Sequence, residues 1–146
     1  MDGLDTRIVD ILQKDGRASN AGIAREVGVS EGTVRRRLKR LVQEEYIQVV
    51  ALPDPVKMGY ESQALVGVQV DPDKIDQVAD DLSELSQVNW VAVTTGSYDI
   101  FAWATLQSAE ALGIFLRTKV GIISGVRRTE TFVSLANKKR GYGTII

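Results

Sequence analysis

A proline-containing break near residue 53 divides the sequence into two parts with different periodicities, and this division constrains the fold more than any other feature. Pro53, Asp54 and Pro55 interrupt regular structure, so residues 53–62 are expected to form a fairly stiff linker. Apolar residues before the break recur at helical spacing, whereas strand and helix patterns alternate after it. The 146 residues are therefore expected to form two domains, residues 1–52 and residues 63–146.

The first part is expected to contain three short helices and a strand. An apolar stripe that begins at Leu4 predicts a first helix that ends at Asp15-Gly16. A second helix is predicted over about residues 19–27, with Ser19 or Asn20 as its N-cap. Ser30 is predicted to cap a third helix that runs to about Glu44, and residues 46–52 (Y-I-Q-V-V-A-L) favour a strand.

The second part is expected to alternate strands and helices in the order β-α-β-β-α-β. This order is typical of a ferredoxin-like, α+β domain. The expected elements are a strand over 64–70, a helix that begins at Asp71-Pro72, a strand over 88–95, a turn at Gly96-Ser97, a strand over 98–106, a helix that begins at Ser108 and a strand over 126–135.

The composition excludes several classes of function. The sequence contains no cysteine and no histidine, which removes disulfides, thiol nucleophiles, imidazole bases and zinc sites of the Cys/His type. We see no spacing for a carboxylate-only metal site and expect no cofactor. No apolar run approaches the ~18 residues of a membrane span, and no secretory signal pattern opens the chain, so we expect a cytoplasmic protein that makes no membrane contact.

One short segment carries most of the local positive charge. The net charge of the chain is −1, yet five cations and a single anion lie between Ser30 and Gln43. Acidic residues gather instead between Asp71 and Glu84. A cationic patch on an otherwise acidic protein attracts a polyanion to one face and repels it from the others.

The second and third helices match a helix-turn-helix. Gly28 suits the sharp turn between them, while Ala24, Val29 and Val34 fill the angle. The outward face of the third helix then fits the major groove of double-stranded DNA, and backbone N–H groups at the start of the second helix are placed for a phosphate. The candidate DNA-contacting residues are Ser19, Asn20, Ser30, Glu31, Gly32, Thr33, Arg35, Arg36, Lys39 and Arg40.

A plainer interpretation treats the same cations as a solvated helix face. Charge runs are usually of this kind, and Glu44 and Glu45 are available as partners. Glu31 is also unusual at the front of a recognition helix, where it either accepts from cytosine or favours the helix N-terminus. We favour DNA binding because the cations share their helix with a turn motif that matches at several core positions.

The whole chain resembles the Lrp/AsnC, or feast/famine, family of bacterial and archaeal regulators. Four motifs occur in the family's order. They are L-D-T-R-I-V-D-I-L-Q-K-D-G-R-A-S at 4–19, V-G-V-S-E-G-T-V-R-R-R-L-K-R-L at 27–41, T-G-S-Y-D at 95–99 and R-T-E-T-F-V at 128–133. One departure is Tyr46, which stands where many members have glycine before the isoleucine of the strand.

The resemblance implies a winged helix-turn-helix domain followed by a ferredoxin-like RAM domain (regulation of amino acid metabolism). It implies that the RAM domains dimerise through their sheets and that the dimers assemble into octamers or larger rings. It also implies that a small effector, most often an amino acid, binds at interfaces near the G-x-Y-D element.

The residues themselves give a physical reason for an effector site. Asp99 can pair with an ammonium group, and a turn at Gly96-Ser97 can expose backbone N–H groups to a carboxylate. The alternative is a well-formed hairpin turn in which Asp99 bonds local backbone. The candidate effector-binding residues are Gly96, Ser97, Tyr98, Asp99 and Thr131.

Aromatic residues on the expected strands favour a homodimer. Trp90, Phe101, Trp103 and Phe132 recur at period-two spacing. A sheet with helices on one face must cover its other face, and an isologous dimer does so without further sequence.

The function we expect is a sequence-specific DNA-binding transcriptional regulator whose binding or assembly responds to a small effector, by resemblance an amino acid. One alternative is a ligand-binding or assembly module whose DNA binding is vestigial. Another is an enzyme like the haem-pathway (sirohaem) decarboxylases of similar two-domain plan. Those enzymes rely on histidine, which this sequence lacks, so we expect no catalysis.

Overall fold

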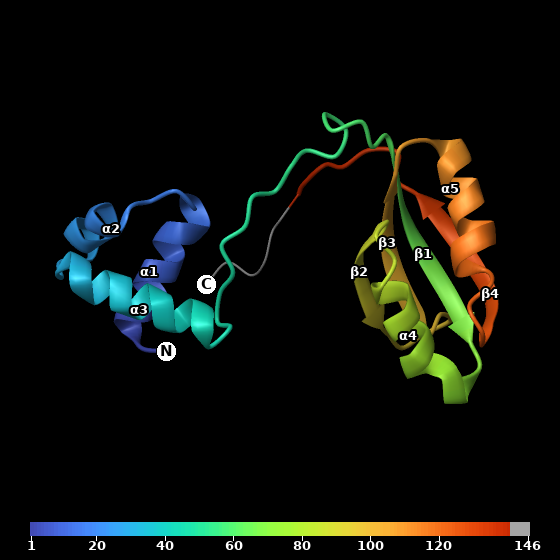
Figure 1. The fold of residues 1–146 in the computed structure, drawn as a ribbon, viewed down its shortest axis with the longest axis horizontal. Coiled ribbons are helices and arrows are strands. Elements are labelled where there is room, and N and C mark those ends of the chain that lie inside the picture. Colours follow the sequence, from blue (N-terminus) through green and yellow to red (C-terminus); the bar gives the residue numbers. More distant parts are fainter. Residues whose placement is uncertain (141–146) are drawn as a thin grey trace. The chain divides into compact units, whose positions relative to one another are not determined.

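The computed structural model describes residues 1–140, which form two compact units (Figure 1). The first unit contains Met1–Leu52 and the second Pro53–Lys139. Residues 141–146, which the sequence assigned to the second domain, lie outside the described residues.

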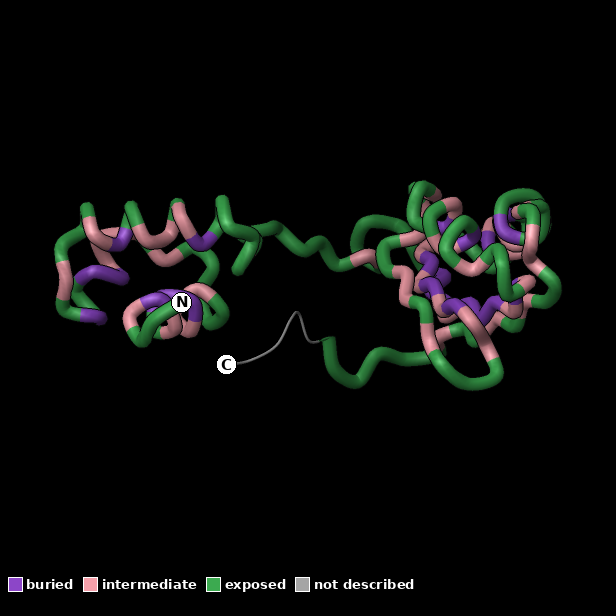
Figure 2. Tube along the Cα trace, turned by 90° about the horizontal axis from the view of Figure 1, so that it is seen from below, coloured by how far each residue is buried: buried purple, intermediate pink, exposed green. Residues whose placement is uncertain are grey.

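The first unit is a bundle of three helices around a small apolar core. The helices are α1 (Gly3–Lys14), α2 (Asn20–Val27) and α3 (Glu31–Gln43), as the sequence predicted. Ile8 of α1 and Val34 of α3 are fully buried in this core. Figure 2 shows that the buried positions of each helix lie on its inner side.

The predicted strand over residues 46–52 is wrong for this chain. The segment has no strand pairing within the part of the chain that the structure describes, so the helical unit lacks the expected wing. The backbone N–H groups of Tyr46 and Ile47 instead donate to the Leu41 carbonyl and close the end of α3. A strand needs a hydrogen-bonding neighbour, and β-propensity alone does not supply one.

The predicted linker begins with a turn. The carbonyls of Asp54 and Pro55 accept from the Met58 N–H, and the Gly59 N–H donates to the Val56 carbonyl.

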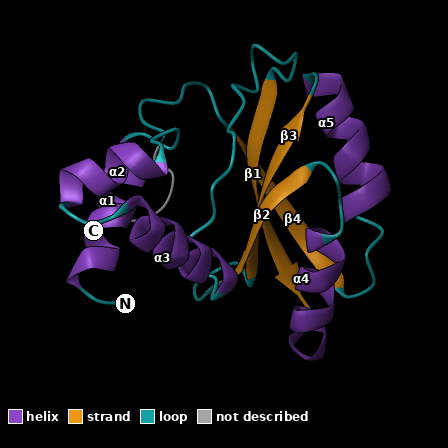
Figure 3. Cartoon of the chain, turned by 60° about the vertical axis from the view of Figure 1, so that its left-hand side comes forward, coloured by secondary structure: helices purple, strands orange, loops and turns teal. Residues whose placement is uncertain are grey.

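The second unit is a four-stranded antiparallel sheet with helices on one face (Figure 3). The sheet order is β2-β3-β1-β4, which is the order of a ferredoxin-like domain and confirms the predicted α+β plan. The elements are β1 (Ser62–Val70), η1 (Pro72–Lys74), α4 (Ile75–Ser83), β2 (Val88–Val93), β3 (Ile100–Leu106), α5 (Ala109–Phe115), η2 (Leu116–Val120) and β4 (Val126–Val133).

β1 begins two residues earlier than predicted, and β2 and β4 each end two residues earlier, at Val93 and Val133. Two further boundaries differ because of local hydrogen bonding. Asp71 makes no side-chain cap, and a 3₁₀ turn precedes α4, which begins at Ile75. The third strand begins at Ile100 rather than at residue 98, because Tyr98 and Asp99 belong to the turn.

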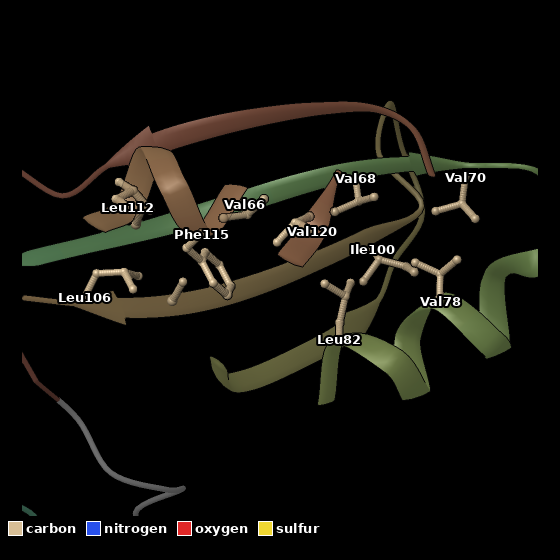
Figure 4. Close-up of a cluster of buried hydrophobic side chains, with 12 residues drawn as sticks. Val66, Val68, Val70, Val78, Leu82, Ile100, Leu106, Leu112, Phe115 and Val120 are labelled. Carbon is tan, nitrogen blue, oxygen red and sulfur yellow. The ribbon is translucent and has the colours of Figure 1, made fainter. Parts of the chain in front are cut away.

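Alternate residues of the central strands build the core of this unit. Val66 and Val68 of β1 point towards the helices and belong to one buried cluster with Val78 of α4 and Phe115 of α5, as Figure 4 shows. Since residues paired across an antiparallel ladder share a face, the alternate positions project from the helix-free face of the sheet.

The helix-free face carries aromatic side chains. Trp90 pairs with Trp103, and Leu65 pairs with both Trp103 and Phe132. Trp90 is 51% exposed and Phe132 is 44% exposed. The aromatic residues identified in the sequence therefore belong to one apolar face, which lies opposite the core.

Candidate functional site

A tight turn joins α2 to α3 and sets the entry of the candidate recognition helix. Gly28 ends α2 at φ +76°, a left-handed conformation that residues with a Cβ atom rarely adopt. The Gly28 and Val29 N–H groups both donate to the Ala24 carbonyl, at 2.9 Å and 3.1 Å. Ser30 then caps α3 by accepting from the Thr33 N–H at 3.2 Å. The Ser30 and Thr33 hydroxyls also hydrogen-bond to each other at 2.9 Å, so both support the first turn of the helix.

Three cations of α3 project outward. Arg35, Arg36 and Lys39 are exposed, and so are Glu31 and Gly32 at the front of the helix. Arg35 Nη2 lies 2.5 Å from Glu31 Oε1, and the Arg35 side chain is 69% exposed. The sequence hypothesis requires these residues to be exposed, but their contact with a duplex stays a prediction.

The other two arginines of α3 turn inward to α1. Arg37 Nη1 donates to Asp5 Oδ1 at 3.1 Å and also bonds the Asp2 carboxylate. Arg40 Nη2 donates to Asp5 Oδ2 at 2.5 Å, so its phosphate-contacting role, expected from sequence, competes with an internal ion pair. Arg40 also lies 4.0 Å from Glu44, one of the two glutamates named as possible partners.

The carboxylates that hold these arginines were not among the residues predicted from the sequence. Asp2 and Asp5 form a capping box at the start of α1, in which each side chain accepts from the backbone N–H of the other residue. An acidic residue three positions after a possible N-cap is a recognisable signal for this motif. This signal indicates the N-cap of α1, but it does not indicate that the two carboxylates also bond arginines of α3.

Electrostatics keeps this cluster ionised. The hydrogen bond from Arg37 and that from the Asp5 N–H lower the pKa of Asp2 from 3.8 to about 2. Burial raises the pKa of Asp5, but the Asp2 N–H, Arg37 and Arg40 outweigh it, and the net pKa is lowered. The same two carboxylates raise the pKa of Arg37.

Of the two N-caps that the sequence allowed for α2, Ser19 is the one in the structure. Ser19 Oγ accepts from the Gly22 N–H at 3.0 Å, and Asn20 is the first residue of the helix. A hollow of about 470 Å³ lies beside it, and its charged lining residues are Lys14, Asp15, Arg17 and Glu26. The two signs balance in this lining, so charge alone does not favour an anion here.

The G-S-Y-D segment forms an ordered hairpin turn before β3. Gly96 adopts φ +103°, and the Thr94 N–H donates to the Asp99 carbonyl at 2.9 Å. One carboxylate oxygen of Asp99 accepts from the Val70 N–H at 2.8 Å, and Gln69 donates to the Ser97 carbonyl at 2.9 Å. Asp99 thus bonds backbone, as the plainer interpretation held, but the donor lies on β1 and not in the hairpin.

Tyr98 lies on the helix-free face because Gly67 leaves room for it. A Cβ atom on Gly67 would lie 2.9 Å from Tyr98 Cγ and 3.1 Å from Phe101 Cε1. The Tyr98 ring makes edge contacts with Phe101 and Phe132, at centroid distances of 5.4 Å and 6.3 Å. A glycine inside the strand pattern A-L-V-G-V-Q-V is a sequence signal for such a close approach, and it was not among our predictions.

Thr131 is not brought next to Asp99 within one chain. Thr131 pairs with Val66, so it faces the helices, whereas the Asp99 carboxylate bonds Val70. Val66 and Val70 are four residues apart on β1, which corresponds to about 13 Å at ~3.3 Å per residue. The five candidate effector residues therefore form one tight group, 96–99, and a separate threonine.

The described residues hold neither a membrane span nor a metal cluster. Within residues 1–140, no helix is long and apolar enough to cross a membrane. In the same part of the chain, no group of three or more acidic side chains is placed to hold a metal ion.

A helix-turn-helix unit with an outward cationic helix, joined to a four-stranded ferredoxin-like unit, defines a two-domain DNA-binding regulator. Residues 1–42 match the AsnC-type helix-turn-helix domain, and residues 63–144 match the Lrp/AsnC ligand binding domain. The chain belongs to the Lrp/AsnC family, and it is a DNA-binding transcriptional regulator with a ligand-binding domain.

Known proteins resemble the chain over nearly its full length. An HTH-type transcriptional regulator of Pyrococcus furiosus is 42% identical over 146 residues, and the match covers 99% of each chain. The regulator Ptr1 of Methanocaldococcus jannaschii is 35% identical over 142 residues, with 97% and 96% of the chains covered. The structure of Escherichia coli AsnC superposes with a TM-score of 0.88 at 27% identity and 97% coverage of both chains.

A second solved structure shares the fold. The complex of a Neisseria meningitidis transcriptional regulator with L-Met superposes with a TM-score of 0.87 at 24% identity, and the match covers 96% of this chain and 93% of that one.

Proposed function

We propose that the chain regulates transcription by reading a specific DNA sequence with the exposed face of α3. The observation that carries this proposal is the outward group Arg35, Arg36 and Lys39 on a helix whose opposite side is anchored in the core. Arginine can pair bidentately with guanine in the major groove, and lysine further along the helix suits phosphate. Glu31, Gly32 and the capped starts of α2 and α3 complete the proposed contact surface.

Selection of binding sites from a random duplex library tests this proposal. Wild-type protein should enrich a pseudo-palindromic site whose half-sites lie about 34 Å apart, or a multiple of that distance. Arg35→Ala or Arg36→Ala should weaken binding to that site about 5- to 150-fold if the arginine makes a bidentate base contact. Enrichment of no discrete sequence would instead support a module with vestigial DNA binding.

We propose further that an amino acid binds at the turn formed by residues 96–99 and modulates DNA binding or assembly. The left-handed Gly96 leaves the turn open to a close ligand approach, and the Asp99 carboxylate offers a partner for an ammonium group. The L-Met complex of the Neisseria regulator, which has the same fold, supports this ligand class. Thr131 lies apart from Asp99 within one chain. It would therefore belong to such a site only if it came from another subunit or if the ligand were bound in a different orientation.

A thermal-shift screen of the twenty amino acids identifies the effector, and one substitution assigns the site. Asp99→Asn keeps an acceptor for the Val70 N–H but removes the negative charge, so it should abolish the stabilisation by the effector while basal DNA binding remains. Asp73→Asn, at an exposed position of the same unit, is the matched control. An unchanged ligand response in the Asp99 variant would refute the assigned role.

We propose that two copies dimerise through the helix-free face of the sheet and that dimers associate into octamers or larger assemblies. The aromatic face supports the dimer because monomeric proteins rarely leave a contiguous apolar patch uncovered. The family supports the higher assembly. A DNA-binding regulator acts where the DNA is, so we place the protein in the cytoplasm, and its similarity to regulators supports a role without catalysis.

A further inference from the structure

An ion cluster joins the N-terminal helix to the recognition helix. The Asp5 carboxylate is 0% exposed, and its two oxygens accept from Arg37 and Arg40, which lie 32 and 35 residues later in the chain. Arg37 also bonds Asp2, the N-cap of α1. The cluster therefore connects the first turn of α1 with the inner side of α3.

A buried carboxylate constrains its partners more strictly than an apolar contact does. Removing an ionised group from water is costly unless hydrogen-bonded opposite charges remain in place, so Asp5 requires the two guanidinium groups. Apolar burial of Val34 and Leu41 is non-directional and tolerates small rotations of α3. Charge-assisted hydrogen bonds have geometric specificity and resist such rotations.

The cluster also separates the cations of α3 into two sets. The Arg37 side chain is only 24% exposed, whereas its neighbour Arg36 is an exposed residue. If Asp5 were neutral, Arg40 would lose the carboxylate that it bonds, whereas Arg37 would keep its bond to Asp2. Arg40 would then be a flexible cation beside the DNA-contacting face. Such cations bind any phosphate backbone and carry no sequence information.

We propose that Asp5 is a positioning residue for DNA recognition. It fixes the rotation of α3 through Arg37 and Arg40 and withholds both arginines from non-specific phosphate contact. The outward set Arg35, Arg36 and Lys39 then meets the major groove in one orientation. This inference rests on the proposed reading of DNA by α3.

The test compares the full-length wild type with Asp5→Asn on two duplexes. One duplex is selected by the wild type from a random library, and the other is a scrambled duplex of the same length and base composition. Fluorescence anisotropy at several salt concentrations gives both affinities and their salt slopes. Asp10→Asn is the matched control, because Asp10 lies on the same helix but pairs with Lys14 at the surface, at 2.7 Å.

We expect Asp5→Asn to lower the ratio of the two affinities about tenfold, which is the effect of removing one base interaction. We expect its salt slope on the scrambled duplex to steepen by about one, as a released arginine neutralises a phosphate. Asp10→Asn should change neither quantity. Equal weakening on both duplexes with an unchanged slope is what a smaller folded fraction produces, and it would overturn the positioning role.

Two cations of α3 keep the test decisive if Asp5→Asn fails to fold by circular dichroism. Lys39→Gln should reduce the salt slope by about one, because it removes the proposed phosphate contact. Arg37→Gln should lower discrimination and leave the slope unchanged. A reduction of the slope in Arg37→Gln equal to that of Lys39→Gln, or retained discrimination, would overturn the proposal.

The failure of the two proposals is distinguishable. A wild type that binds both duplexes equally contradicts sequence-specific reading itself, and the positioning role falls with it. The positioning role alone is contradicted if the wild type prefers the selected duplex and the Asp5→Asn and Arg37→Gln variants prefer it equally strongly.

Discussion

Asp2 both caps α1 and pairs with Arg37 of α3, and this double role makes the helical unit sensitive to acid. The Arg37 hydrogen bond lowers the pKa of Asp2 from 3.8 to about 2 in the folded chain. A lowered folded-state pKa contributes stability that is present above the unfolded value and is lost as the pH falls through the folded value.

The stability of the first unit should therefore decline between about pH 4 and pH 2. Thermal unfolding followed by circular dichroism over this range measures the decline. Asp2→Asn retains an acceptor for the cap but not the titrating charge, so its stability should depend less on pH in the same range. An equal pH dependence in both proteins would contradict the role of the Arg37 contact.

Gly67 makes a second residue-level prediction. Gly67→Ala places a Cβ atom within 3.1 Å of the Tyr98 and Phe101 rings, so it should lower the free energy of unfolding by about 1–3 kcal/mol and displace Tyr98. Chemical denaturation measures this change. Gly113→Ala in α5 is the control, because its Cβ would contact only the flexible end of Arg117, at 3.4 Å. A fully tolerated Gly67→Ala would contradict the close packing of Tyr98.

At the residue level, the sequence predicts roles that depend on nearby residues but not contacts with residues far away in the chain. Ser19, Ser30 and Gly28 act through neighbours within four residues, so the sequence identified their roles. The inward turn of Arg37 and Arg40 depends on Asp5, which lies 32 and 35 residues away from them. Helical spacing kept Arg37 off the predicted outward face but assigned Arg40 to it, and the spacing named no partner for either arginine.

At the level of elements, α3 depends on one buried stripe. Leu41 is fully buried, whereas the next residue, Val42, is exposed. Leu41→Ala should lower the free energy of unfolding by about 2–5 kcal/mol, because it leaves a cavity in the core of the helical unit. Urea denaturation measures this effect.

Val42→Ala is the control for that prediction. Because its side chain faces solvent, it should change the free energy of unfolding by no more than about 0.5 kcal/mol. Similar destabilisation in both variants would contradict the assigned orientation of α3.

The sequence predicts poorly the features that depend on pairing between strands. Residues 46–52 have strand-forming side chains, but no described strand pairs with them, so the pattern alone misled. Thr131 was grouped with Asp99 because it lies on the expected last strand and could add a hydroxyl to the site. The register of β4 against β1 decides that Thr131 faces the helices, and a single sequence does not define that register.

At the level of the whole molecule, the helix-free face should determine assembly. Phe132→Lys introduces a charge into that face and should convert dimers to monomers in size-exclusion chromatography with light scattering. Ile122→Lys is the control, since Ile122 is 72% exposed but follows η2 and lies on no strand of the sheet. A Phe132→Lys protein that remains dimeric would place the subunit interface elsewhere.

The central claim is that the outward cations of α3 bind duplex DNA, and the salt dependence of binding tests it most directly. The selected duplex is titrated with the wild type and with a variant in which glutamine replaces Arg35, Arg36 and Lys39. The salt concentration is varied between about 50 and 200 mM, because phosphate contacts make the affinity change strongly over this range. We predict that the variant folds, binds the duplex far more weakly and has a salt slope shallower by about one, because Lys39 is the proposed phosphate contact. A folded variant with wild-type affinity and slope would contradict the account.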